Sequence, residues 1–227
     1  MNVPANWRAR LARMPAASRK PTHLAGRMSQ RLLRANAAQV ESANRLITWA
    51  SWHLDTAAMG WDVYRLALPN GDDNLTGHPL HTVEIAAENL IFRGVVSAMD
   101  QCAAAIFRLT SEPYRADREH DVGWWFDARG GRPWQLVPQP LAQWLRVFDG
   151  NATWKLATEL RDAFTHRTIR RDINVLVSVG WKAKATAKFE VAGALHEVED
   201  LMPLLVAFGT RRYSAFERAL ARAYPLR

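Results

Sequence analysis

The sequence predicts a mainly α-helical protein, an antiparallel helical bundle with a small β-hairpin near residues 172–192. Two long segments, 28–66 and 79–107, repeat apolar residues at steps of three and four, which is the period of a half-buried helix. The hairpin segment instead alternates apolar and polar residues, as a strand with one buried face does. Because a lone two-stranded ribbon is barely stable, this hairpin must pack on the helices or pair with a second copy.

The first two predicted helices are separated by a clear turn, PNGDDN at residues 69–74. Residues 28–66 contain no proline, and Pro79 suits the first turn of the second helix. The broad apolar face of that second helix also carries Glu84 and Glu88. Ionised carboxylates are rarely buried without a partner, so these two glutamates are candidates for an ion pair with another helix.

The segment 111–140 is rich in proline and glycine and is predicted to be a long loop. Loops of this length in a compact domain are often functional. Aromatic and basic residues are interleaved in it, namely Trp124, Trp125, Phe126, Arg129, Arg132 and Trp134. They either stack on nucleic-acid bases or, as is more common, hold the loop against the core.

The remaining elements follow from the apolar period of each segment: a short helix at 141–148, a helix at 151–166, strands near 173–179 and 183–191, and a final helix or pair of helices from about residue 196. Gly209 is the expected break within the last of these. Lys182, Lys184 and Lys188 form a charged row on the second strand. This row either meets phosphates or, more commonly, protects a strand edge from aggregation.

Net charge is concentrated at the start of the chain. The formal charge is +8, yet residues 1–40 hold eight of the basic residues and no acidic one, so the rest of the chain is neutral. We therefore expect a basic, flexible arm at residues 1–27 and a single helical domain at 28–227. Such an arm either follows phosphate backbones or anionic surfaces, or is a solvated tail.

The single cysteine, Cys102, excludes an internal disulfide and fits a reducing compartment. It lies in an apolar run, so we expect a buried, inert thiol. We expect no stretch of the eighteen or so apolar residues that a membrane span requires, and no apolar centre of a secretory signal near the N-terminus. We thus expect the protein to be soluble and cytoplasmic and to have no membrane partner.

The helix at 151–166 gathers polar chemistry against an apolar face. Arg161, Asp162 and His166 supply a fixed cation, a carboxylate and a side chain that titrates near neutrality. Asp162 and His166 are four apart and hence neighbours on a helix. Arg161 and His166 are about 140° apart, so they converge only if the helix frays near Thr165 or if a second copy supplies one of them.

The string from Arg161 to His166 resembles the R-x4-6-H motif of the HEPN superfamily, including the polar residue that often follows the arginine. The resemblance covers residues 28–170 and implies a small helical bundle that forms a homodimer. It also implies a metal-independent endoribonuclease that leaves 2′,3′-cyclic phosphate ends, of the kind found in toxin–antitoxin and phage-defence systems. Under this hypothesis Arg161 binds the phosphate, His166 transfers protons, and Asp162 orients one of them.

The same hypothesis assigns supporting roles to other residues. Glu84 or Glu88 forms a salt bridge with Arg161, while Arg167, Arg170 and Arg171 help to bind RNA. RNA, a second copy of the chain, and an antitoxin or other protein are the expected partners. The alternative hypothesis is a non-catalytic helical interaction module, in which Arg161, Asp162 and His166 form a structural ion network.

Other kinds of site find no support in the sequence. Glycine-rich nucleotide-binding loops and CxxC pairs are absent, so no cofactor is expected. His78 and His81 lie three apart near a turn without suitable companions, so no metal site is expected there. Asp100 falls away from the apolar face of the second helix, and a structural hydrogen bond is its expected role.

Overall fold

The computed structural model describes residues 37–67, 78–110, 120–128, 131–165, 171–176, 184–191 and 194–225. Its helices are α3 (Ala37–Ala67), α4 (His78–Thr110), α5 (Val122–Asp127), α6 (Arg132–Leu136), α7 (Gln139–Arg146), α8 (Ala152–Thr165) and α9 (Val198–Ala223). Its strands are β1 (Arg171–Leu176), β2 (Lys184–Val191) and β3 (Ala194–Glu197). The predicted mainly α-helical class is confirmed.

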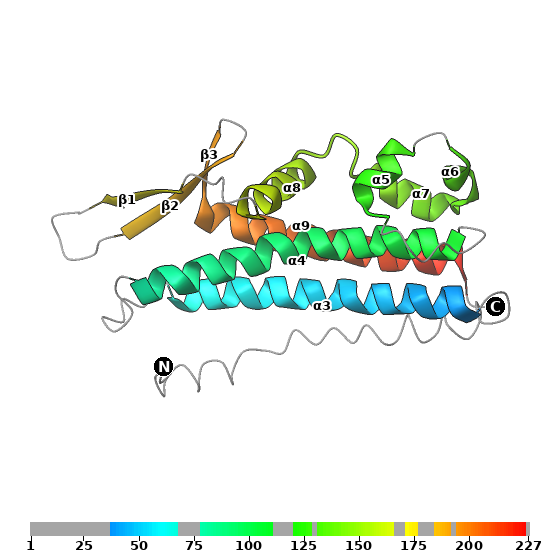
Figure 1. The fold of residues 1–227 in the computed structure, drawn as a ribbon, viewed down its shortest axis with the longest axis horizontal. Helices are drawn as coiled ribbons and strands as arrows, with labels where there is room; N and C mark the ends of the chain where they lie inside the picture. Colours follow the sequence, from blue (N-terminus) through cyan, green and yellow to red (C-terminus); the bar gives the residue numbers. More distant parts are fainter. Residues whose placement is uncertain are drawn as a thin grey trace.

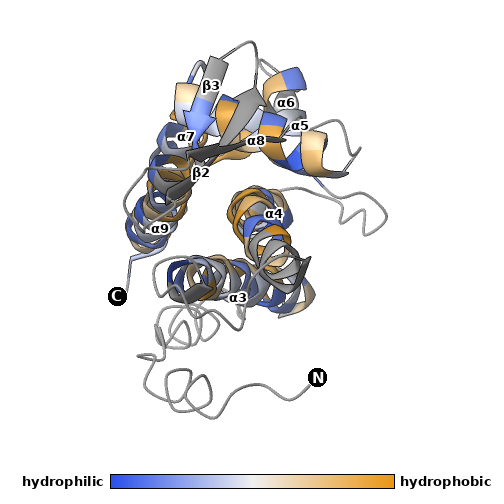
Figure 2. Cartoon of the chain, turned by 90° about the vertical axis from the view of Figure 1, so that its left-hand side faces the viewer, coloured by the Kyte–Doolittle hydropathy of each residue, from blue (hydrophilic) through white to orange (hydrophobic). Residues whose placement is uncertain are grey.

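Three long helices form the frame of the bundle (Figure 1). α3 and α4 lie antiparallel along most of their length, and α9 packs against both. In the end-on view, the shorter helices α5 to α8 lie over α4 and α9, on the side away from α3 (Figure 2). Because α3, α5, α8 and α9 all contact α4, this helix is apolar nearly all round, as a helix buried on every side must be.

Glycines let the backbones of α3 and α4 approach closely. A Cβ at Gly94 would lie 2.6 Å from the carbonyl oxygen of His53, and one at Gly60 would lie 2.9 Å from that of Ala87. Alanines line the same interface, and Ala57 and Ala87 are fully buried. Small side chains on both helices therefore set the distance between them.

The aromatic residues of the predicted loop hold that segment against the core. Trp125 is fully buried, and its indole N–H donates to the carbonyl oxygen of Ala103 in α4 over 3.0 Å. Trp134 in turn donates to the carbonyl oxygen of Trp125 over 2.6 Å. The structure thus favours the anchoring role over base stacking. It also corrects the prediction of a plain loop, because α5 and α6 lie within it and are too short to show a helical period.

The predicted hairpin is confirmed, and a third strand extends it. β1 pairs antiparallel with β2, with Arg171 opposite Phe189 and Leu176 opposite Lys184. β2 then pairs antiparallel with β3, giving the order β1-β2-β3. The four-residue β3 shows too little alternation to be predicted from sequence. The expected lysine row falls on side chains outside the described residues and stays a prediction.

α9 corrects the prediction of a break at Gly209, since it runs unbroken from Val198 to Ala223. A Cβ at Gly209 would lie 2.8 Å from Cδ2 of Leu54 in α3 and 3.2 Å from Cγ1 of Val95 in α4. The glycine therefore serves the close packing of α9 on the other two long helices. In a continuous helix, packing outweighs the low helix propensity of glycine.

Among the described residues, one helical segment meets the length and composition of a membrane span, contrary to the expectation from sequence. It comprises Ile85–Thr110 of α4, of which 72% is buried inside the bundle. The central helix of a water-soluble bundle meets the same criteria. Cys102 lies within this segment and is fully buried. Burial, with the nearby carboxylates of Glu217 and Asp100, raises the pKa of its thiol well above the usual value, as expected for an inert cysteine.

The predicted basic arm at residues 1–27, and the start of the first predicted helix at 28–36, lie outside the described residues. The arm and the boundary between arm and domain therefore stay predictions. Within the described part, the buried residues form one hydrophobic cluster that draws on α3, α4, α5, α7, α8 and α9. A single core is the arrangement expected of one domain.

The glycine contacts yield a test of the packing. We expect Gly94→Ala to lower the free energy of unfolding by about 1–3 kcal/mol, because the new methyl group meets a backbone carbonyl that cannot move aside. Gly209→Ala serves as the matched control. There the methyl group mainly meets the end of the flexible Leu54 side chain, and alanine favours the helix by roughly 0.5–1 kcal/mol. Urea unfolding of both variants measures the difference, and equal losses of stability would contradict this account of the α3–α4 interface.

Candidate functional site

α8 carries the predicted polar cluster and begins as the sequence predicts. The side-chain oxygen of Asn151 accepts the backbone N–H of Trp154 over 3.0 Å, which caps the helix. Trp154, Ala157 and Leu160 are buried. Phe164 packs edge-on against Phe92 of α4, with ring centroids 5.0 Å apart. This apolar stripe fixes α8 on α4 and leaves Arg161 and Asp162 at the border between core and solvent.

Arg161 is held by two carboxylates. Its Nη1 donates to Oδ2 of Asp100 over 3.2 Å, and its Nε donates to Oδ1 of Asp162 over 2.9 Å. Nη2 lies 2.9 Å from the same Asp162 oxygen. A guanidinium carries five N–H donors, so these contacts leave at least two for another acceptor. The side chain of Arg161 is 33% exposed, so a ligand can reach it.

Asp100 joins three helices at this point. Besides Arg161 of α8, its other carboxylate oxygen accepts the backbone N–H of Val122 at the start of α5, over 3.2 Å. Asp121, next to it, caps α5 by accepting the backbone N–H of Trp124 over 2.7 Å. The structural hydrogen bond expected of Asp100 is confirmed, and its ion pair with Arg161 is an addition that the sequence did not indicate.

The surroundings of Asp100 place its titration near neutrality. Burial raises the pKa of Asp100 to about 7, and the negative charges of Asp121 and Asp162 act in the same direction. The Val122 N–H and the positive charge of Arg161 lower the pKa but do not outweigh burial. At neutral pH the site therefore holds a carboxyl group that both gains and loses its proton readily.

The structure corrects the expected partner of Arg161. Among the described side chains, Asp100 and Asp162 hold the guanidinium in place of the expected Glu88, and the expected pair with Glu84 stays a prediction. α8 does run antiparallel to α4 as expected, but Arg161 lies at the level of Asp100, about 18 Å along α4 from Glu88. Glu88 is nonetheless fully buried, as its place on the apolar face indicates. The Glu84 side chain lies outside the described residues.

The structure brings together only part of the predicted site. Arg161 and Asp162 are in contact as described above. His166, Arg167 and Arg170 lie outside the described residues, and Arg171 is described only as the first residue of β1. The roles of these four residues stay predictions. Asp100 and Asp121 are the members of the cluster that sequence reasoning missed, because their proximity to α8 depends on tertiary packing.

A metal centre finds no support in the described part of the chain, where no group of three or more histidine, cysteine, aspartate or glutamate residues is arranged to hold an ion. Comparison with protein-family models, curated proteins and solved structures finds no match.

The raised pKa of Asp100 predicts a specific dependence of stability on pH. Between the ordinary aspartate pKa of 3.8 and the folded-state value of about 7, the folded chain binds the Asp100 proton more tightly than the unfolded chain does. The contribution of Asp100 to stability therefore falls as pH rises through this window and is constant above it.

Asn at position 100 does not ionise and keeps an acceptor for the Val122 N–H. We therefore expect the melting temperature of Asp100→Asn, relative to the wild type, to rise from about pH 5 to about pH 8. Asp127→Asn at the exposed end of α5 is the control for removing one carboxylate. A difference between Asp100→Asn and wild type that is constant over this range would contradict the assigned pKa.

Proposed function

We propose that this chain is a metal-independent endoribonuclease resembling the HEPN superfamily, with a composite site shared across a homodimer. The observation that carries the proposal is the set of contacts and the partial exposure of the Arg161 side chain. It is oriented by Asp100 and Asp162, it is one-third exposed, and it retains N–H donors near the end of α8, five residues before His166 in the sequence. A cation fixed in advance and open on one side is suited to a phosphate.

The chemistry of RNA cleavage defines the remaining roles. Without a metal, the reaction needs a base that takes the 2′-hydroxyl proton, an acid that protonates the leaving 5′-oxygen, and a cation for the charge on the phosphate. In this proposal Arg161 supplies the cation and His166 transfers a proton. Asp162 and Asp100 position Arg161. Two copies facing each other supply two histidines, one as base and one as acid.

The proposed setting follows from the same resemblance. The chain would act in the cytoplasm on RNA, within a toxin–antitoxin or phage-defence system and under the control of an antitoxin or other protein partner. Arg167, Arg170, Arg171 and the basic arm at residues 1–27 would add phosphate contacts along the substrate, which makes binding weaken as salt concentration rises.

RNA cleavage in the presence of EDTA tests the proposal. We expect the wild type to release fragments with 2′,3′-cyclic phosphate ends, and His166→Ala to reduce the rate by about 10²-fold or more, because a proton-transfer group contributes roughly that much. Arg161→Gln removes the cation and should produce a loss of similar size. Both variants are compared at matched folding, judged by circular dichroism.

Lys155→Gln is the matched control, since it removes a positive charge from the same helix at a side chain that is 76% exposed. It should cleave at the wild-type rate. Absence of cleavage by the wild type over a broad set of RNAs would refute the ribonuclease, and equal activity of His166→Ala would refute the site assigned to it.

A second function is favoured by one specific observation. Asp100 ties α4 to α5 through Val122 and to α8 through Arg161, so the cluster joins three helices. In a non-catalytic interaction module such a network would fix the bundle and present its outer face to a protein partner. Structural ion networks perturb pKa values as catalytic sites do, so the pKa of Asp100 fits both functions.

A double-mutant cycle with Arg161→Gln and Asp100→Asn separates the two functions. If the cluster is structural, the stabilities should show a coupling energy on the order of 1 kcal/mol, as expected for a partly exposed ion pair, and neither variant should alter any RNA cleavage. Coupling near zero combined with loss of cleavage in Arg161→Gln would assign the cluster to catalysis.

A further inference from the structure

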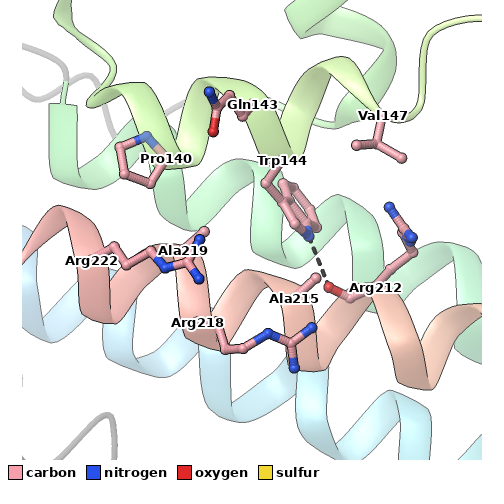
Figure 3. A pocket seen from close by; sticks show the side chains of 9 residues that line it. All are labelled: Pro140, Gln143, Trp144, Val147, Arg212, Ala215, Arg218, Ala219 and Arg222. Carbon is pink, nitrogen blue, oxygen red and sulfur yellow. Dashed lines mark hydrogen bonds between the residues drawn. The ribbon is translucent and has the colours of Figure 1, made fainter.

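A hollow of about 240 Å³ lies between α7 and the C-terminal half of α9, and it is lined by three arginines (Figure 3). Arg212, Arg218 and Arg222 approach it from α9, and Gln143 and Trp144 approach it from α7. None of these residues belongs to the Arg161 cluster, which is formed by α4, α5 and α8. The pocket is therefore a separate feature of the fold.

The sequence of α9 explains why a hollow forms there. At 100° per residue, Arg212, Ala215, Arg218, Ala219 and Arg222 fall on one face of the helix. The two alanines lack the side-chain atoms needed to fill the space against α7. The longer arginines line that space from successive positions along α9, so the hollow has positive charge on its α9 side.

The wall of the pocket is fixed by buried contacts. The indole N–H of Trp144 donates to the backbone carbonyl oxygen of Arg212 over 2.8 Å, which joins α7 to α9 (Figure 3). The Trp144 ring packs against Phe148 and Phe216, with centroids 4.8 Å and 5.2 Å away. The Arg212 guanidinium also lies 5.9 Å from the Phe208 ring. A ligand would thus meet a site whose frame is already in place.

The charge in this pocket is not balanced by the described part of the chain. Neither Arg212, Arg218 nor Arg222 forms an ion pair there, and the Nε of Arg212 is buried without a hydrogen-bond partner. Burial, together with the positive charges of Arg211 and Arg218, lowers the pKa of Arg212. Glu217, the acidic residue in this stretch of α9, lies on the opposite side of the helix, where its charge acts on Cys102 and Tyr213.

We propose that this pocket binds a phosphate group, held by the guanidinium groups of Arg212, Arg218 and Arg222 with the Gln143 amide at its edge. Guanidinium groups match the geometry of phosphate oxygens through paired N–H donors, and an anion would supply the acceptor that the buried Nε of Arg212 lacks. The volume fits a phosphate with a few attached atoms and is smaller than a pocket for a drug-sized ligand. The phosphate belongs either to a small free ligand or to a nucleic-acid backbone.

Two probes distinguish these sources. Inorganic phosphate, compared with chloride at equal ionic strength, tests for a small ligand by thermal shift and calorimetry. A fluorescein-labelled 2′-O-methyl oligouridylate, followed by anisotropy, tests for a backbone phosphate. This oligonucleotide lacks the 2′-hydroxyl nucleophile, so the result does not depend on the proposed ribonuclease activity.

The test variant is the triple substitution Arg212→Gln, Arg218→Gln, Arg222→Gln. Its control, Arg146→Gln, Lys155→Gln, Arg211→Gln, removes the same charge from exposed positions outside the pocket. We expect the wild type and the control to bind at least one probe, and the pocket variant to bind it at least about tenfold more weakly, since each charge-assisted hydrogen bond contributes roughly that factor.

Binding of inorganic phosphate would identify a small phosphate ligand, and binding of the oligonucleotide alone would identify a backbone phosphate. Failure of the wild type to bind either probe, or equal weakening in the pocket variant and its control, would overturn the proposal. If the partly buried Arg212→Gln change disturbs folding, the double variant Arg218→Gln, Arg222→Gln at exposed positions gives the same test.

Discussion

The structure depends on the burial of α4 from every side. α3, α5, α6, α8 and α9 all pack against it, so nearly every position along it from Ala87 to Phe107 must be small, apolar or satisfied by a partner. Gly94 is the small residue at the tightest contact with α3, and Met99 and Ile106 are apolar side chains that are fully buried. Because α4 is enclosed in this way, it sets the positions of the helices around it. A change in one of its buried side chains alters the packing of those helices.

Asp100 is the carboxylate within this mostly buried helix that contacts α5 and α8. A carboxylate on a helix with so little exposed surface needs donors, and they come from two other helices: the Val122 N–H of α5 and the guanidinium of Arg161 of α8. The same contacts orient Arg161. Because its conformation is fixed before any ligand arrives, little further entropy would be lost on binding a phosphate. The contacts of Asp100 therefore serve both the packing of the helices and the proposed binding of a phosphate by Arg161.

The sequence predicts what depends on local pattern and misses what depends on tertiary register. The periods of α3, α4 and α8 and the pairing of β1 with β2 all follow from residues close together in the chain. The partner of Arg161 does not, because Asp100 and Glu88 lie on the same helix and only the packing of α8 along α4 decides which of them is near.

Other misses have the same physical cause. In the sequence alone, Gly209 indicates a helix end. In the structure, its lack of a side chain allows α9 to pack closely against Leu54. α5 and α6 complete little more than one turn each, so no apolar period marks them. The arginine pocket also escapes sequence reasoning. Arginines spaced along α9 are typical of a solvated face, and only the position of α7 beside α9 creates the hollow that they line.

The enclosed position of Cys102 gives the chain a built-in reporter of its own motions. It is the sole cysteine of the sequence, it is fully buried in α4, and its thiol remains protonated because its pKa is raised. A thiol reagent can therefore modify it only when the helices around α4 separate. The rate of modification measures how often the bundle opens, and dependence of that rate on protein concentration would show whether a second copy holds it closed.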